Sequence, residues 1–295
     1  PALEADALHL AFFLERAVEA RWGEPGDAKR QALERLRNTR LWGEVPDDLD
    51  LEEHRTLDRL AATPLWECAA RLAAVLAAEA RWADGWRPRR ILELGAGLGI
   101  PAFVAARLWP EASVAVTECS GSLVDLLRRN LRANFPTATS AKRLRPGRSL
   151  LAFDLAFGGE AAEAALAGPL RDLGGPVELV IVSDCFFFPW YGDTWTPLRA
   201  SLLRLCSEAT LVLLCTKHRG GGRVADALDF VSQPPFHRRL LRREDGVCGV
   251  CEGEGYIDSG LCWSCEGVDM KEESEEVWLL AKSEAALASW KSEVV

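Results

Sequence analysis

Three glycines alternate with other residues in the stretch RILELGAGLGIPAF, at positions 90–103. Gly95, Gly97 and Gly99 follow an apolar run that is typical of a strand and precede one that is typical of a helix. A glycine turn at the start of a helix lets the backbone approach a ligand closely and directs unpaired N–H groups toward it. The stretch therefore predicts a cofactor-binding turn, and a tight turn without a ligand is the simpler alternative.

Two cofactors fit this turn. The frame that starts at Gly97 satisfies the dinucleotide pattern G-x-G-x-x-G/A, and Glu118 then follows at about the distance in sequence expected of a ribose ligand. The frame Glu93-x-Gly95-x-Gly97-x-Gly99 resembles the S-adenosylmethionine pattern of the seven-strand methyltransferases, which implies that Glu118 takes the ribose hydroxyls. Because the apolar run ends at Leu94, the dinucleotide frame starts late and holds Pro101 inside its phosphate turn. A carboxylate at Glu93 also suits a cationic amino-acid ligand better than a pyrophosphate, so we favour S-adenosylmethionine.

An acid and a run of aromatic residues follow a second apolar stretch, in VSDCFFFPWY at 182–191. Asp184 stands at the carboxyl end of an expected central parallel strand, where ligands of such sheets bind. Aromatic faces attract ammonium and sulfonium groups, and a carboxylate attracts an amine that must lose its proton. Methyl transfer from a sulfonium needs mainly that nucleophile and methyl group are held in line. We therefore place Asp184 in the site; a helix cap and, for the phenylalanines, core packing are the alternatives.

Four cysteines near the C-terminal end have the spacing C-x2-C-x10-C-x2-C. This spacing is typical of a tetrahedral zinc site with four thiolate ligands. The surrounding residues, 246–268, are rich in glycine and poor in apolar side chains. We expect a structural zinc-type insert here; redox dithiols and a loop without metal are the alternatives. The expected ligands are Cys248, Cys251, Cys262 and Cys265.

The elements that must position these residues change character along the chain. Residues 1–87 have the periodicity of helices, which predicts a helical N-terminal extension. From residue 88 onward, short apolar runs alternate with helical stretches, which predicts a parallel sheet with helices on both faces. Two further strands, at 236–245 and 274–284, flank the cysteine insert. The apolar runs lie at 90–94, 113–118, 177–184 and 209–217, and the helical stretches at 101–108, 121–133, 159–172, 196–207 and 223–232.

Composition limits the class of protein. The chain has 295 residues, 48% of them hydrophobic, which is enough for a large core. Its formal charge of −9 argues against nucleic-acid binding, and no apolar run is long enough for a membrane span. Five single cysteines are expected to be reduced, buried thiols, which favours the cytoplasm or nucleus. These are Cys68, Cys119, Cys185, Cys206 and Cys215, and the scattered His9, His54, His218 and His237 are expected to be surface or packing residues.

The motifs resemble those of the seven-β-strand protein-lysine methyltransferases, the group that includes the calmodulin-lysine and chaperone-lysine enzymes. PLWECAARLAAVL resembles the segment VWDAALVLAKYL of that family, and ILELGAGLGIPAFVAA resembles its motif I. VTECSGSLVDLLRRNLRAN is similar to its LTD…LxxLxxNxxxN block, and ELVIVSDCFFFPWY to DLVLGADCVYDPEY. The resemblance implies a Rossmann-like class I methyltransferase fold, spanning 88–295, with a mostly parallel seven-stranded sheet. The last strand of that fold is antiparallel, so the cysteine insert is expected at the carboxyl edge of the sheet.

The resemblance also implies an activity, the transfer of a methyl group from S-adenosylmethionine to the lysine of a protein substrate. A small-molecule amine N-methyltransferase of the same fold and a non-catalytic zinc-containing adaptor are the alternatives, and no nucleic-acid or membrane partner is expected. Phenylalanine replaces the commoner tyrosine at 187, and FDL only faintly echoes the family's LDW. The implied cofactor-binding residues are Trp66, Glu93, Gly95, Gly97, Gly99, Glu118 and Asp154, and the implied catalytic residues are Asp184 and Phe187.

Overall fold

The structure is a computed structural model. It describes residues 68–69, 71–73, 75–76, 86–119, 121–135, 148–186, 193–218, 223–246, 256–257, 260–261 and 273–290. The extension predicted over 1–87 therefore lies mostly outside the described residues, although those at 68–76 that are described are helical.

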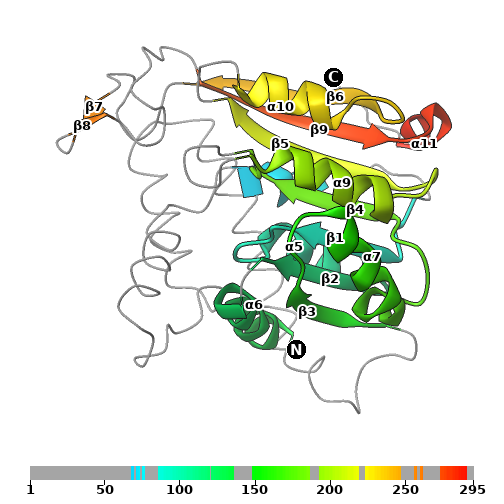
Figure 1. The fold of residues 1–295 in the computed structure, drawn as a ribbon. Helices are drawn as coiled ribbons and strands as arrows, with labels where there is room; N and C mark the ends of the chain where they lie inside the picture. Colours follow the sequence, from blue (N-terminus) through cyan, green and yellow to red (C-terminus); the bar gives the residue numbers. More distant parts are fainter. Residues whose placement is uncertain are drawn as a thin grey trace.

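A seven-stranded sheet forms the centre of the protein, with the order β3-β2-β1-β4-β5-β9-β6 (Figure 1). Neighbouring strands from β3 to β5 are parallel, and β9 is antiparallel to both β5 and β6. This arrangement is that of the class I methyltransferase fold, so the predicted fold is confirmed. The strands are β1 (Arg90–Leu94), β2 (Ser113–Glu118), β3 (Leu150–Asp154), β4 (Leu179–Ser183), β5 (Leu211–His218), β6 (His237–Gly246) and β9 (Glu273–Ala281).

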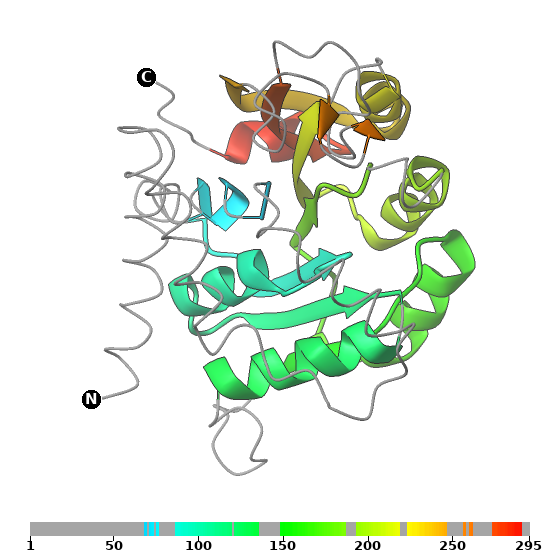
Figure 2. The same cartoon turned by 90° about the vertical axis from the view of Figure 1, so that its left-hand side faces the viewer.

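Helices cover both faces of the sheet (Figure 2). Central parallel strands are buried on both sides, and every residue of β2 is buried accordingly. One face packs against the described helical residues 68–69, 71–73 and 75–76, and against α5 (Ile100–Leu108), α6 (Gly121–Asn134) and α11 (Glu284–Ser289). The other face packs against α7 (Gly159–Ala167), η1 (Pro169–Leu173), α9 (Trp195–Leu205) and α10 (Arg223–Val231).

The helical stretch predicted over 159–172 is interrupted, because the segment forms two helical elements. α7 ends at Ala167, Gly168 follows as its cap, and η1 begins with Pro169. Proline has no N–H to donate to the preceding helical turn, so the α-helix cannot continue through it.

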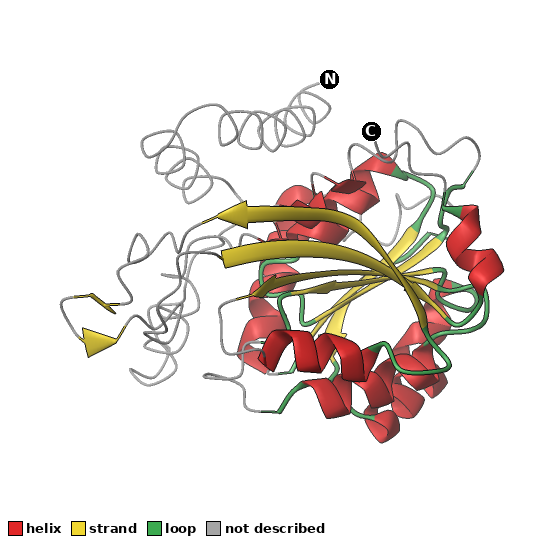
Figure 3. Cartoon of the chain, turned by 90° about the horizontal axis from the view of Figure 1, so that it is seen from above, coloured by secondary structure: helices red, strands yellow, loops and turns green. Residues whose placement is uncertain are grey.

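The connection between β6 and β9 leaves and returns at the carboxyl edge of the sheet. Gly246, the last residue of β6, lies opposite Glu273, the first residue of β9. Within this connection, β7 (Tyr256–Ile257) pairs with β8 (Gly260–Leu261) in a separate antiparallel hairpin. Figures 1 and 3 both show this hairpin beyond the ends at which β6 stops and β9 starts. The expected place of the cysteine insert agrees with these strand ends.

The five single cysteines are free thiols. Burial raises the pKa of Cys206 to about 12 and raises the pKa of Cys68, Cys185 and Cys215 as well, so these thiols stay protonated and unreactive. The expectation of burial is wrong for Cys119, which is exposed after the end of β2. In the described part of the chain, no helix has the length and apolar character needed to span a membrane.

Candidate functional site

The glycine turn after β1 has a left-handed backbone. Gly95, Gly97 and Gly99 have φ values of 60°, 53° and 80°. A Cβ on Gly95 would lie 2.9 Å from the Cys185 Sγ, and one on Gly99 would lie 2.8 Å from the Phe103 ring, so packing requires glycine at both positions. A Cβ on Gly97 would meet nothing within 4 Å. The turn is thus closely packed at its two ends and open at its centre, where a ligand can approach the backbone.

Glu118 reaches this turn from the end of β2. Its Oε1 accepts a hydrogen bond from the Gly97 N–H at 2.8 Å, and its Oε2 accepts one from the Cys119 N–H at 3.0 Å. Burial raises the pKa of the Glu118 carboxyl, and the two N–H donors oppose that rise. The structure therefore brings Glu118 and the glycine turn together, as the sequence predicts.

Glu93 lies beneath the turn and is fully buried. Its Oε2 accepts a hydrogen bond from the Ala102 N–H, in the first turn of α5, at 3.0 Å. Its Oε1 is also buried and has no hydrogen-bond partner among the described residues. Burial raises the pKa of Glu93 from 4.5 to about 8; the Ala102 N–H lowers it and the charge of Glu118 raises it further. A cationic group that approached Oε1 would favour the ionised carboxylate.

Asn130 supports the turn from α6, and the sequence analysis gave it no role. Its side chain is fully buried, and its Nδ2 donates a hydrogen bond to the Leu98 carbonyl at 3.3 Å. One turn further along the helix, the Asn134 Nδ2 donates to the Asn130 carbonyl at 2.8 Å. The available signal was an amide among leucines on the apolar face of an amphipathic helix, because a buried amide needs a polar partner.

Asp184 follows β4 with φ 51°, the one positive φ of a non-glycine residue in the described part of the chain. Its N–H donates to the Cys215 carbonyl at 2.9 Å, and its Oδ1 accepts from the Lys217 N–H at 3.4 Å. The buried carboxylate is thereby held against the end of β5. At α9, the Thr196 N–H donates to Asp193 instead, so that helix does not use Asp184 as its cap. A strained backbone at a buried acid is typical of a functional position.

Asp154 ends β3 directly beside Glu118, since these two residues are partners in the β2–β3 register. The Leu155 N–H donates to the Glu118 carbonyl at 2.9 Å, which fixes the end of β3 against β2. The described members of the predicted site thus gather at the carboxyl ends of β1 to β4. Trp66 and Phe187 lie outside the described residues.

The predicted zinc ligands also lie outside the residues that the structure describes. Within the described part, no group of three or more His, Cys, Asp or Glu side chains could hold a metal ion. The four ligand cysteines therefore remain a prediction from their spacing.

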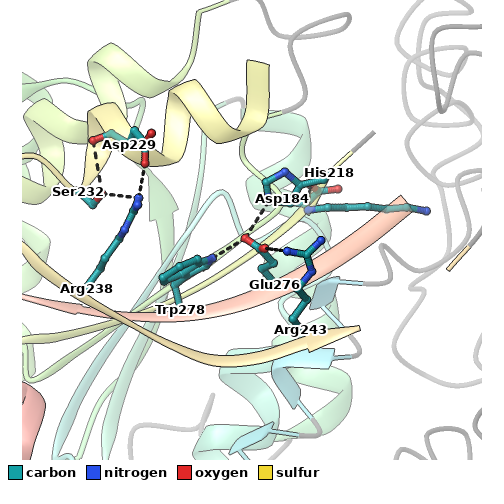
Figure 4. Close-up of polar contacts among 9 residues, drawn as sticks. Asp184, His218, Asp229, Ser232, Arg238, Arg243, Glu276 and Trp278 are labelled. Carbon is teal, nitrogen blue, oxygen red and sulfur yellow. Dashed lines mark hydrogen bonds and ion pairs between the residues drawn. The ribbon is translucent and has the colours of Figure 1, made fainter. Parts of the chain in front are cut away.

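Two histidines, expected at the surface or in packing, each pair with a glutamate. The His218 Nε2 lies 2.9 Å from the Glu276 Oε2 at the carboxyl edge of the sheet. The His237 Nδ1 lies 3.6 Å from the Glu284 Oε1 at the opposite end of β6. His218 shares its edge with Asp184, as Figure 4 shows.

Comparison with known proteins agrees with this geometry. A family model described as "Lysine methyltransferase" matches residues 45–152. The curated "Secreted RxLR effector protein 48" of Plasmopara viticola is 30% identical over 151 residues, which cover 50% of this chain and 72% of that protein. The chain belongs to the lysine methyltransferase family. The matched range of this chain contains the glycine turn, Glu118 and Asn130, and it ends within β3, before Asp184.

Solved structures with lower identity are also similar in fold to this chain. An arsenic(III) S-adenosylmethionine methyltransferase from Chlamydomonas reinhardtii is 18% identical with a TM-score of 0.44, and the match covers 72% of this chain and 74% of that one. An O-methyltransferase from Bacillus cereus in complex with SAH is 13% identical with a TM-score of 0.40, covering 80% of this chain and 93% of that one.

Proposed function

We propose that this protein transfers a methyl group from S-adenosylmethionine to a lysine side chain of a protein substrate. One observation carries the proposal. A left-handed glycine turn, closed by Glu118 and open at Gly97, shares a sheet edge with the buried carboxylate of Asp184. The glycine turn with Glu118 suits a nucleoside cofactor, and the carboxylate of Asp184 suits an amine.

The residues at the turn fit S-adenosylmethionine. Glu118 would accept hydrogen bonds from the ribose hydroxyls, and the backbone around Gly97 offers an open surface for close approach. The buried Oε1 of Glu93, which has no partner among the described residues, fits the ammonium of the methionine part. When bound, the cofactor supplies a methyl group activated on a sulfonium. Trp66 and Asp154 are proposed as further contacts of the cofactor on the family resemblance.

Asp184 and Phe187 are proposed to receive the target lysine. A carboxylate fixed by the Lys217 N–H attracts an ammonium group and orients it, while an aromatic ring attracts the same cation through its face. Once the lysine has lost its proton, the displacement needs mainly an in-line geometry, so holding the lysine is the main contribution expected of these residues. The zinc-type insert at 246–268 and a reducing compartment, cytoplasm or nucleus, remain parts of this proposal that rest on the sequence.

The test uses tritiated S-adenosylmethionine, the full chain and a cell extract. We expect label in a discrete protein band and, after hydrolysis of that band, in methyl-lysine. Label only in small molecules would instead indicate an amine methyltransferase. Absence of both labelling and cofactor binding would indicate an adaptor, and tight binding of NADH would contradict the cofactor assignment.

A further inference from the structure

β5 and β9 continue past the end of β4. The last residue pair between β4 and β5 is Ser183 with Cys215. β5 then extends to His218 while it remains paired with β9, up to the pair of His218 with Ser274. At about 3.3 Å per residue, His218 lies about 10 Å beyond the last residue pair. The extended strands therefore project past the carboxyl end of β4, beside Asp184.

On these projecting strands, Glu276 of β9 forms hydrogen bonds with His218 and Trp278 and an ion pair with Arg243 (Figure 4). Its Oε2 lies 2.9 Å from both the His218 Nε2 and the Trp278 Nε1, and its Oε1 lies 3.5 Å from the Arg243 NH1 of β6. The carboxylate is buried, with 7% of the residue exposed. An ion pair with Arg243 and a hydrogen bond from the Trp278 indole keep this carboxylate in one orientation, so it can fix the ring of His218 in turn.

The bond to Glu276 defines the state of the His218 ring. A carboxylate accepts, so Nε2 carries the hydrogen and Nδ1 keeps its lone pair in the neutral ring. In the described part of the chain, Glu276 is the one group that bonds to this ring. The side chain is 23% exposed, so the ring is partly open to solvent. His218 thus has one nitrogen held by the protein and one available as a base.

The charged groups around His218 come from four elements. Glu276 lies on β9, Arg243 on β6 and Asp184 after β4. Lys217 precedes His218 on β5, and Glu275 precedes Glu276 on β9. Because side chains alternate along a strand, these two register partners point to the face of the sheet opposite to His218 and Glu276. The Lys217 N–H donates to the Asp184 Oδ1, which places Asp184 one residue from His218 along β5.

We propose that His218 accepts the proton of the target lysine and that Glu276 is the residue that positions its ring. This inference rests on the proposed function, because it assigns a base to the same reaction. The proton passes from the lysine Nζ to the His218 Nδ1, and from there to water. Asp184 binds an ammonium best while it stays charged, whereas histidine is the side chain suited to exchange a proton near neutral pH. The two residues thus divide attraction and proton removal between them.

His218→Gln is the first variant to test, because a glutamine amide can still donate to Glu276 but cannot accept a proton. With tritiated S-adenosylmethionine and the extract protein that the wild type labels, we expect kcat at neutral pH to fall by about 10²-fold. The loss should shrink at alkaline pH, where the lysine deprotonates unaided. KM and cofactor affinity should stay within several-fold. Glu276→Gln should lower kcat by a smaller factor and should shift the acidic limb of the pH profile of kcat.

His237→Gln is the matched control. His237 also pairs with a glutamate, but it lies at the start of β6, far from the carboxyl edge that holds His218. It should retain the wild-type rate and pH profile. A readout that does not need turnover is the ¹⁵N NMR spectrum of the His218 ring, assigned by the His218→Gln variant. We expect the Nε2–H tautomer in the wild type and a mixture of tautomers in Glu276→Gln.

Two results would overturn this inference while leaving the proposed function intact. One is a His218→Gln variant that labels the substrate at the wild-type rate throughout the pH range. The other is a neutral ring with its hydrogen on Nδ1. If the wild type labels no lysine at all, the proposed function itself fails, and the assignment of a base fails with it.

Discussion

The Oε1 of Glu118 accepts a hydrogen bond from the backbone N–H of Gly97 across 2.8 Å, although Glu118 ends β2 and Gly97 lies in the turn after β1. This bond ties together the ends of two neighbouring parallel strands. It fixes the carboxylate before any ligand arrives, while the outer side of Gly97 stays open. A ligand with vicinal hydroxyls would therefore meet an acceptor that is already oriented, which lowers the entropic cost of binding.

Substituting Gly97 should abolish cofactor binding without unfolding the protein. Gly97→Arg places a large side chain where a ligand would approach, in a region that is open in the protein itself. The positive φ adds a strain on the order of 1 kcal/mol. Gly174→Arg is the control, because Gly174 also has a positive φ and open space around its Cα but lies after η1. Calorimetry with S-adenosylmethionine should show no heat of binding for Gly97→Arg and near wild-type affinity for Gly174→Arg.

Glu93 should make the stability of the free protein depend on pH. Its folded pKa of about 8 lies above the ordinary value of 4.5, so the folded state keeps a proton that the unfolded chain has lost. The contribution of Glu93 is therefore fully present below pH 4.5 and is lost as pH rises toward 8. Glu93→Gln, which can still accept from the Ala102 N–H, should remove this loss, on the order of a few kcal/mol.

Urea unfolding at pH 5 and pH 8 measures the effect. From pH 5 to pH 8 the wild type should lose free energy of unfolding that Glu93→Gln keeps. The variant should therefore be more stable relative to the wild type at pH 8 than at pH 5. Glu160→Gln, on the exposed surface of α7, is the control and should follow the wild type at both pH values. Parallel pH dependences for wild type and Glu93→Gln would contradict the assignment of a neutral Glu93 in the free protein.

Removing the charge of Asp184 should separate binding of the cofactor from methyl transfer. Asparagine tolerates the left-handed backbone at this position and can still accept from the Lys217 N–H, whereas alanine adds strain. We expect Asp184→Asn and Asp184→Ala to keep cofactor affinity within several-fold and to lower methyl transfer by about 10²-fold. Asp172→Asn, at an exposed residue of η1, should match the wild type. Unchanged turnover in the Asp184 variants would place the amine site elsewhere.

Much of the fold could be predicted because strands that are buried on both faces consist mostly of apolar residues. The runs at 90–94 and 113–118 coincide with β1 and β2, since both are enclosed by other strands and by helices. The break at Gly168 was missed because apolar residues continue on both sides of it, as alanines before it and as Leu170 and Leu173 after it. Local backbone chemistry, here a proline that cannot donate, outweighed the apolar pattern.

The candidate site also contains residues that could be predicted from the sequence and residues that could not. Glu118 and the glycine turn could be predicted because a strand–turn–helix unit fixes their spacing along the chain. His218 and Glu276 could not, because they are 58 residues apart in sequence and only the antiparallel pairing of β5 with β9 brings them together. Nothing local marks either residue as a partner of the other.

The cysteine insert should bind one zinc ion per chain and help to select the protein substrate. Its connection leaves the sheet after Gly246 and returns at Glu273, on the edge that carries Asp184. A folded insert there would stand beside the entrance for the target lysine. Metal analysis of protein purified under reducing conditions should find one zinc per chain. Cys262→Ser should lose it, whereas Cys119→Ser, at an exposed thiol outside the insert, should retain it.

Replacing residues 247–268 with a short Gly-Ser turn should separate methyl transfer, carried out by the core, from selection of the protein substrate, which we assign to the insert. Few apolar side chains occur in the insert, so the thermal unfolding of the core and the affinity for S-adenosylmethionine should stay close to wild type. Activity on the native protein substrate should fall far more than activity on a short lysine peptide, because only the larger substrate can reach from the site to the insert. Equal losses on both substrates would mean that the insert supports the methyl-transfer site itself, and protein without zinc would remove the basis for a folded insert.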